Sequence, residues 1–288
     1  MRATGRALRQ TFCVLICFCL FFDLAAIVLA RGNEDAVCRV EINKANPNAP
    51  EYFRVTNKTA GDLTINFLLP TANNVTATPT LPRTWVLQPR ASESLFSIHP
   101  ANSRRAWRYE YRFFWRNGRP NARHDDSQRY RLPFPSGQRF RVIQGNNGSF
   151  SHFGEYQYAV DFDMPEGSII CAARGGVVVR AEDSFSGRGL TDEYRNRTNV
   201  ILIQHDDGTI GEYAHLRKGG KLVHMGDTVS TGQKLGYSGD VGYSDGAHLH
   251  FGVWKPIDGK TIESIRVTFT DGVNMYNELR EQVTYTAH

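Results

Sequence analysis

The sequence predicts an all-β protein with a small antiparallel β-sandwich over residues 31–118 and a second β-sheet domain over residues 137–288. Two observations predict this class. Many short segments alternate large apolar with polar side chains, which is the period of a half-buried strand. Between residues 130 and 256, glycine-punctuated segments of this kind follow one another without a sustained helical period. With 41% hydrophobic residues among 288, each domain can bury a core of its own.

Residues 1–30 have the features of a signal peptide and are set apart from the fold. Three arginines precede an unbroken apolar run over residues 12–22, and small residues stand at the end of a second apolar piece. We therefore expect cleavage after Ala30 and export to the periplasm, the cell envelope or the medium. The alternative is that the leader stays as a membrane anchor. Asp23 opposes that, because a carboxylate within a spanning helix costs about 2.5–3.5 kcal/mol.

Short strands separated by turn residues fill the first domain. Segments 52–55 and 63–68 flank the turn-rich segment 59–62, which predicts a hairpin. Aromatic residues alternate from Trp107 to Trp115 and form either a surface on which sugars stack or a core face, and the spacing is typical of a core. Together with segments 52–55 and 63–68, three alternating segments suggest a small sandwich: residues 84–88, 94–98 and the aromatic segment 108–115.

Residues 119–136 are polar and carry three prolines, so we assign them as a linker or a segment that wraps the next domain. In the second domain, Asp206, Asp207 and Gly208 separate two apolar segments and predict a hairpin turn. The tail over residues 273–281 is the one helical candidate. The expected strands of this domain are 138–144, 158–162, 168–172, 176–181, 200–205, 211–216, 233–238 and 248–254.

Histidines and one aspartate carry the chemistry that the sequence suggests. His248 and His250 are two apart on an expected strand, so both imidazoles face the same side. Asp161 stands in an apolar strand, where an unpaired carboxylate is costly, and His215 ends another strand. Residues of these types more often lie at the surface or in the core without binding a metal. Three metal-competent groups on three strands of one domain nevertheless suggest a shared site, and two histidines with a carboxylate and a water form a catalytic zinc arrangement.

Six sequence blocks of the second domain occur in the order of a known family: 159–162 with 164–168, 172–178, 213–216, 226–229 with 232–233, 239–242 and 246–251. With these blocks, residues 145–255 resemble the lysostaphin/LytM-type zinc metalloendopeptidases of bacterial cell walls. The resemblance covers over a third of the chain and implies a peptidase domain with its core over residues 145–256. The segment 226–233 also resembles biotinyl and lipoyl carrier domains, but the lysine that these modify is missing, so only a β-hammerhead or barrel-sandwich geometry is expected.

The resemblance implies a role for each of these residues. Asp161 and His250 are expected to bind Zn²⁺, and His248 is expected to act on the water that the metal activates. His215 is expected to stabilise the transition state or to orient the water. No His-Glu-x-x-His pattern occurs in the chain, so a histidine and not a glutamate would handle the proton.

One position departs from the family pattern. The family places its first histidine ligand four residues before the aspartate, where this chain has Gln157. Glutamine is a poor zinc ligand, so its presence puts metal binding in doubt. His152 stands five residues earlier, after a turn-rich segment that would let it reach the metal, and we assign it as the third ligand. The alternative is an exposed loop histidine.

These inferences predict a secreted zinc-dependent endopeptidase that hydrolyses peptide bonds in peptidoglycan, in the cross-bridge or the stem peptide. The alternative is a catalytically inactive relative that binds peptidoglycan or activates another wall hydrolase. The net charge of +5 comes without a long basic run, so we expect no nucleic-acid partner. Outside the leader only Cys38 and Cys171 remain, and they either pair or stay as buried thiols.

Overall fold

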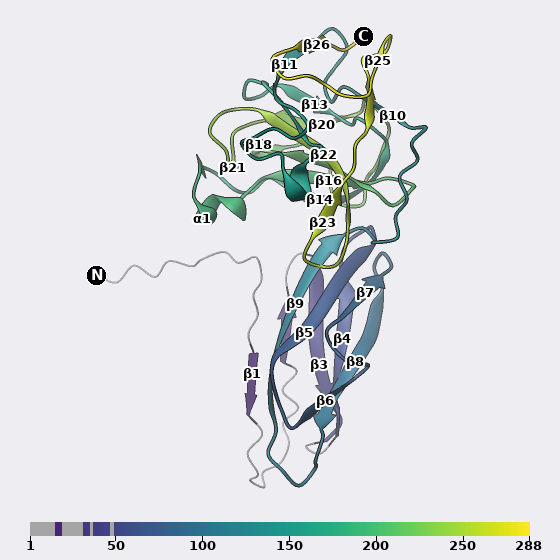
Figure 1. Ribbon diagram of the computed structural model, residues 1–288, viewed down its shortest axis with the longest axis vertical. Helices are drawn as coiled ribbons and strands as arrows, with labels where there is room; N and C mark the ends of the chain where they lie inside the picture. Colours follow the sequence, from purple (N-terminus) through teal and green to yellow (C-terminus); the bar gives the residue numbers. More distant parts are fainter. Residues whose placement is uncertain (1–14, 19–30, 35–36, 47–48) are drawn as a thin grey trace, which may run out of the picture. The chain divides into compact units, whose positions relative to one another are not determined.

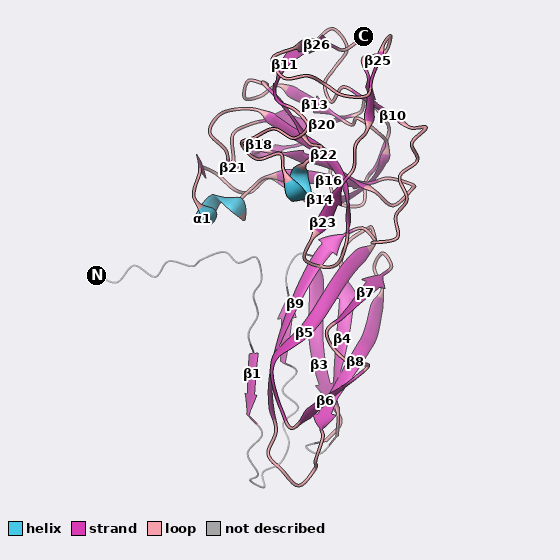
Figure 2. Ribbon diagram, viewed as in Figure 1, coloured by secondary structure: helices cyan, strands magenta, loops and turns pink. Residues whose placement is uncertain are grey.

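A computed structural model describes residues 15–18, 31–34, 37–46 and 49–288 (Figure 1). One compact unit holds Asn117–Ile257 and Thr261–His288, and the other holds the described residues up to Arg116 together with Asp258–Lys260. Strands dominate both units, which confirms the all-β class (Figure 2). The predicted leader lies outside the described residues except for residues 15–18. Among the described residues, no helix has the length and apolar character that a membrane span needs.

The smaller unit is an antiparallel β-sandwich, as predicted. One sheet has the order β1-β9-β5-β7 and the other the order β2-β3-β4-β8-β6. The alternating aromatic residues of β9 form a core face, because Tyr109, Tyr111 and Phe113 are all buried against both sheets. The strands are β1 (Leu15–Phe18), β2 (Arg31–Glu34), β3 (Cys38–Lys44), β4 (Glu51–Asn57), β5 (Leu63–Asn73), β6 (Val75–Thr78), β7 (Arg83–Leu87), β8 (Ser92–Pro100) and β9 (Arg108–Asn117).

The predicted hairpin around residues 59–62 is wrong. Strand β4 pairs with β3 and β8, whereas β5 pairs with β9 and β7, so the turn crosses from one sheet to the other. Buried Asn57 holds this crossing. Its side-chain amide donates to the carbonyls of Gly61 at 2.8 Å and Gln88 at 2.9 Å, and its Oδ1 accepts from the backbone N–H of Thr59 at 2.9 Å.

The larger unit is built on a sheet with the order β19-β14-β16-β17-β22-β12-β11-β26, to which β23 adds by pairing with β22. Smaller sheets have the orders β13-β20-β18 and β10-β24-β25, and β15 pairs with β21. The central strands are β11 (Arg139–Gln144), β12 (Val160–Phe162), β14 (Gly176–Glu182), β16 (Val200–Gln204), β17 (Ile210–Ala214), β19 (Thr228–Val229), β22 (Leu249–Pro256), β23 (Ile262–Ser264) and β26 (Thr284–Thr286). The others are β10 (Arg129–Arg131), β13 (Ile169–Cys171), β15 (Arg188–Gly189), β18 (Leu216–Lys221), β20 (Lys234–Ser238), β21 (Gly242–Tyr243), β24 (Thr268–Thr270), β25 (Met275–Tyr276), the 3₁₀ turn η1 (Gly154–Tyr156) and the helix α1 (Asp192–Arg195).

The segment expected as a linker or wrapping segment packs into the larger unit. Strand β10 pairs with β24, and Tyr130, Leu132 and Phe134 are buried in the core of this unit. Their spacing of two places all three side chains on one face of an extended chain. The segment therefore contributes core side chains to the unit that follows it.

Two local predictions for this unit, a hairpin turn and a helix, have opposite outcomes. The turn at residues 206–208 joins β16 to β17 as a hairpin, which confirms that prediction. The helix expected over residues 273–281 is absent, because β25 lies there and pairs with β24. Residues 271–274 form the turn between these two strands, and the carboxylate of Asp271 accepts hydrogen bonds there from the backbone N–H groups of Val273 and Asn274 and from the hydroxyl of Tyr276. The strand pairing takes the residues after the turn out of a helix.

Candidate metal centre

Three neighbouring strands place polar residues in one row across the main sheet. Gln144 on β11 is the Cα partner of Asp161 on β12, and Asp161 is the partner of His250 on β22. Ala214, at the end of β17, is the next partner of His250. Directly opposite residues of antiparallel strands project to the same face. The sheet register therefore brings a carboxylate and an imidazole together, with His215 one residue beyond the row.

The three predicted ligands converge. Oδ1 of Asp161 lies 2.9 Å from Nδ1 of His250 and 3.2 Å from Nε2 of His152. The two imidazole nitrogens are 3.3 Å apart. Among the described residues, these three side chains form the one group of metal-competent residues whose ligand atoms all lie within 4.8 Å of one another. Ligands of tetrahedral zinc at about 2.0–2.1 Å are separated by about 3.3 Å, so the triangle fits one face of such a site.

His152 reaches this group from the loop between β11 and β12, and its side chain is completely buried. Its Nδ1 lies 3.0 Å from the carbonyl oxygen of Gly145. A carbonyl only accepts, so Nδ1 carries the proton and Nε2 offers its lone pair to the centre. Gln157 does not join the group. Its side chain donates to Oδ1 of Asn147 at 2.8 Å and contacts none of the ligand atoms, and the bond from the Asn147 N–H goes to its backbone carbonyl and does not depend on the side chain.

The electrostatics of the group suit a cation. Burial alone would raise the pKa of Asp161, but the imidazoles of His152 and His250 beside its carboxylate outweigh it and hold that pKa well below its usual value. Burial opposes charge on His250 as well, yet the hydrogen bond to Asp161 and its negative charge raise the pKa of His250. The Asp161 carboxylate is thus ionised, and its negative charge stabilises a positive charge at this buried position. A divalent cation would supply that charge directly.

His215 and His248 lie beside this group. Their ring centroids are 4.5 Å apart, and the ring of His215 is 6.2 Å from that of His250. The backbone of His215 is in the left-handed region, with φ of 67°, a conformation that residues other than glycine rarely adopt. The kink ends β17 and separates it from β18, so this strained residue stands at the edge of the site.

Both of these histidines have their tautomer set by the backbone. Nδ1 of His215 lies 3.0 Å from the carbonyl of Val241, and Nδ1 of His248 lies 2.7 Å from the carbonyl of Gly246. Each Nδ1 therefore carries a proton, and each neutral ring keeps Nε2 as an acceptor. Burial, followed by the neighbouring imidazoles, lowers the pKa of His215 to about 3, which favours its neutral form.

Sequence reasoning did not identify Gln144, although it is buried and directly opposite Asp161. Its Nε2 donates to Oδ2 of Asp161 at 2.9 Å. Glutamine at the end of a strand carries no metal-ligand signal of its own. Its role could have been predicted only from the pairing of β11 with β12. The register of that pairing is irregular between Val142 and Gln144, so counting residues along the two strands does not place Gln144 opposite Asp161.

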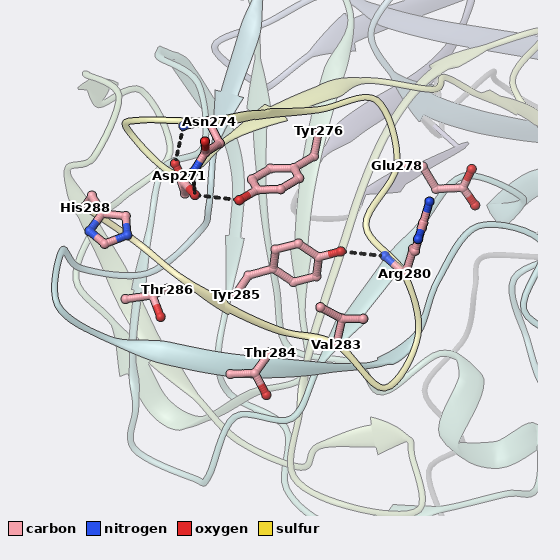
Figure 3. A pocket seen from close by; sticks show the side chains of 10 residues that line it. All are labelled: Asp271, Asn274, Tyr276, Glu278, Arg280, Val283, Thr284, Tyr285, Thr286 and His288. Atoms are coloured by element: carbon pink, nitrogen blue, oxygen red, sulfur yellow. Dashed lines mark hydrogen bonds between the residues drawn. The ribbon is translucent and has the colours of Figure 1, made fainter.

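Two pockets lie near the C-terminal segment of this unit. One, of about 560 Å³, is lined by residues between Asp271 and His288 (Figure 3). The rings of Tyr276 and Tyr285 pack edge to face there, with their centroids 5.1 Å apart. None of the predicted site residues lines it. The other, of about 420 Å³, lies between the loop over residues 145–149 and the segment over residues 278–281. That loop also supplies the carbonyl that orients His152, but none of the three ligand residues lines the second pocket.

Residues 155–264 match the profile of peptidase family M23. The matched range contains Asp161, His215, His248 and His250. His152 lies just before it, in the loop that departs from the family pattern.

Curated relatives match the same part of the chain. An uncharacterized metalloprotease of Buchnera aphidicola subsp. Baizongia pistaciae is 35% identical over 157 residues, which cover 51% of this chain and 39% of that protein. Peptidoglycan DD-endopeptidase ShyA of Vibrio cholerae is 36% identical over 91 residues, 32% of this chain and 18% of that protein. Lysostaphin of Staphylococcus staphylolyticus is 38% identical over 98 residues, 34% of this chain and 18% of that protein. The chain thus spans less than two fifths of the length of these relatives.

Proposed function

Because residues 155–264 match the profile of peptidase family M23, we propose that this chain is an exported zinc-dependent endopeptidase that hydrolyses peptide bonds in peptidoglycan. One relative in the same region is named a peptidoglycan DD-endopeptidase and another a metalloprotease. Those names describe their own proteins. They support the substrate class proposed for this chain, either a cross-bridge or a stem peptide.

The observation that carries the proposal is the triangle formed by Nε2 of His152, Oδ1 of Asp161 and Nδ1 of His250, with sides of 2.9, 3.2 and 3.3 Å. These atoms would hold Zn²⁺ as two histidines and one carboxylate. Three protein ligands leave a fourth tetrahedral position for water or substrate, which is the arrangement of a catalytic and not a structural zinc site. When bound, the ion would lower the pKa of that water toward neutrality and polarise the scissile carbonyl.

The chain's own residues would move the proton. Nε2 of His248 is an acceptor in the neutral ring, so it can take a proton from the attacking water and then carry it to the amine that leaves. Its Nδ1–H stays bonded to the Gly246 carbonyl and keeps the ring in place during both transfers. Nε2 of His215 is also an acceptor, which favours a role in orienting the water over one in donating to an oxyanion.

Exposed aromatic rings beside the ligand group would contact the substrate. Phe150 and Phe153 flank the buried His152 and are both largely exposed, and the ring of Tyr156 lies 5.6 Å from that of His250. Large apolar side chains left open to solvent around a polar site are typical of a surface that binds a ligand. The substrate would therefore lie across these rings, next to the ligand group.

A digestion assay with the purified chain tests the proposal. The chain, loaded with zinc, is incubated with cross-linked peptidoglycan, and the soluble products are analysed by liquid chromatography and mass spectrometry. We expect about one zinc per chain and products with a new amino terminus at one kind of peptide bond. A chelator should stop their release and added zinc should restore it. Zinc-free protein that binds the polymer without cleaving it would favour the inactive scaffold.

A further inference from the structure

We propose that Gln144 is a positioning residue of the metal centre, because its amide fixes both the carboxylate of Asp161 and the loop that carries His152. The inference rests on the proposed function, since it assigns a residue to the same centre. Gln144 is the last residue of β11, is 7% exposed, and stands directly opposite Asp161 in the sheet.

The amide of Gln144 uses all of its hydrogen-bonding capacity inside the protein. Oε1 accepts from the backbone N–H groups of Phe150 and Ser151, each at 3.0 Å. Nε2 donates to Oγ of Ser151 at 2.8 Å and to Oδ2 of Asp161 at 2.9 Å. A carboxamide has two acceptor sites on its oxygen and two protons on its nitrogen, and all four are occupied here.

These contacts allow only one orientation of the amide. Turning it over would place Oε1 against the carboxylate of Asp161 and the NH₂ group against two backbone N–H groups, so three contacts would become repulsive at once and only the Ser151 hydroxyl could reverse its role. Gln144 therefore always presents a donor to Oδ2 of Asp161. With Oδ2 held in this way, Oδ1 is the oxygen that faces the nitrogens of His152 and His250.

The same side chain sets the path of the loop. Phe150 and Ser151, which Oε1 binds, come immediately before His152. The loop also lies directly on the stem of Gln144, since a Cβ atom at Gly148 would be 2.3 Å from Cγ of Gln144. The chain can pass this closely only with glycine at that position. Two of the three proposed ligands thus take their relative position from one buried amide, the arrangement by which outer groups tune a metal site.

Zinc affinity tests this inference in the purified full chain, measured by competition with a chelating dye. We expect Gln144→Ala to weaken zinc binding by about 10–100-fold, the range for loss of a group that orients ligands. Gln157→Ala is the matched control: it removes a glutamine from the same loop that touches no ligand, and it should leave the affinity close to that of the unaltered chain. Equal affinity in the Gln144→Ala variant and the unaltered chain would overturn the assignment.

A second variant separates positioning from simple loop stability. Gln144→Glu keeps the length of the side chain and one oxygen for the N–H groups of Phe150 and Ser151, but in its ionised form, measured at alkaline pH, it cannot donate to Asp161. The readout is the visible absorption spectrum of cobalt-substituted protein, which reports the geometry of the ligands around the metal. We expect an altered spectrum in Gln144→Glu and an unchanged one in Gln157→Ala. An unchanged spectrum in Gln144→Glu would show that the bond to Asp161 positions nothing.

The two proposals fail in different ways. If the unaltered chain binds no zinc and cleaves no peptidoglycan, the proposed function is wrong. If the unaltered chain binds zinc and cleaves, and both Gln144 variants match it in affinity and spectrum, the function stands and the role of Gln144 is rejected.

Discussion

Asp161 and His250 are directly opposite each other on the antiparallel strands β12 and β22, with Oδ1 of the carboxylate 2.9 Å from Nδ1 of the imidazole. Both side chains are buried, so the pair is placed by sheet register and not by flexible loops. A ligand pair held by backbone hydrogen bonds has little freedom to separate. It forms the rigid side of the proposed metal centre, and His152 approaches it from a loop.

His250→Ala should abolish stoichiometric zinc binding. The substitution removes one of three ligands and takes away the imidazole that contacts Oδ1 of Asp161. We expect the zinc content, measured by atomic emission after dialysis, to fall from about one per chain to near zero. His224→Ala is the control, because that imidazole is exposed and outside the group. The same zinc content in both variants would remove His250 from the site.

His248→Ala should separate metal binding from catalysis. This ring lies beside the ligand group, so the variant should keep its zinc. Its hydrolysis of cross-linked peptidoglycan should fall by about 10²–10⁴-fold, the usual contribution of a general acid or base. Zinc content and cleavage rate are measured on the same preparation. Cleavage at the rate of the unaltered chain would reject the catalytic assignment, whereas loss of zinc would make His248 a ligand.

His152→Ala and Gln157→Ala decide which residue completes the centre. His152 points Nε2 at the other two ligand atoms, whereas Gln157 bonds to Asn147. We expect His152→Ala to weaken zinc binding by more than about 100-fold, beyond the range for outer groups, and Gln157→Ala to have little effect. Isothermal titration of the metal-free proteins gives both values. The opposite ranking would show that the loop rearranges when the metal binds.

Much of this site follows from strand alternation, and the remainder depends on contacts that alternation does not encode. Asp161 and His250 each stand in an apolar strand, where polar residues on neighbouring strands indicate a common site. The position of His152 follows from the family resemblance and a turn-rich loop, because a loop has no period. Gln144 could not be predicted, since its role depends on the pairing of β11 with β12 across an irregular register. The helix expected over residues 273–281 fails for a similar reason, because the pairing of β25 with β24 overrides a local propensity.

Replacing Phe150 and Phe153 together by serine should weaken substrate binding without changing the metal site. Both rings are exposed on either side of His152, and Phe153 is 65% exposed. If they pack on the substrate, KM should rise at least about tenfold, because fully burying one phenyl ring contributes about 1.5–3 kcal/mol and about 1.4 kcal/mol corresponds to a factor of ten. Zinc content and kcat should be unchanged.

Val273→Ser is the control for this pair, because Val273 is 74% exposed and lies outside the ligand group. It removes exposed apolar surface without touching the loop. A rise in KM of equal size in the control would point to a general surface effect. A fall in kcat together with loss of zinc in the double variant would mean that the two rings support the loop.

Acid should destabilise the larger unit through His205, a buried histidine outside the proposed centre. Its Nδ1 donates to the carbonyl of Gly175 at 2.8 Å. Burial lowers the pKa of His205 from 6.5 to about 4, and the positive charge of Arg174 acts in the same direction. The unfolded chain therefore binds more protons than the folded chain between pH 6.5 and pH 4. By linkage, the free energy of unfolding falls as the pH falls through this window, by up to about 3 kcal/mol.

His205→Gln isolates this effect, because its amide can still donate to the Gly175 carbonyl but does not titrate. Urea unfolding of the metal-free unaltered chain and the variant is compared at pH 7.5, 5.5 and 4.5. The lowered pKa of Asp207, which is held by Thr209 and by an ion pair with Arg174, makes its contribution disappear only at more acidic pH. It therefore does not obscure the window. The unaltered chain should lose more stability than the variant between pH 7.5 and 4.5, and parallel losses would show that His205 is already charged in the folded protein.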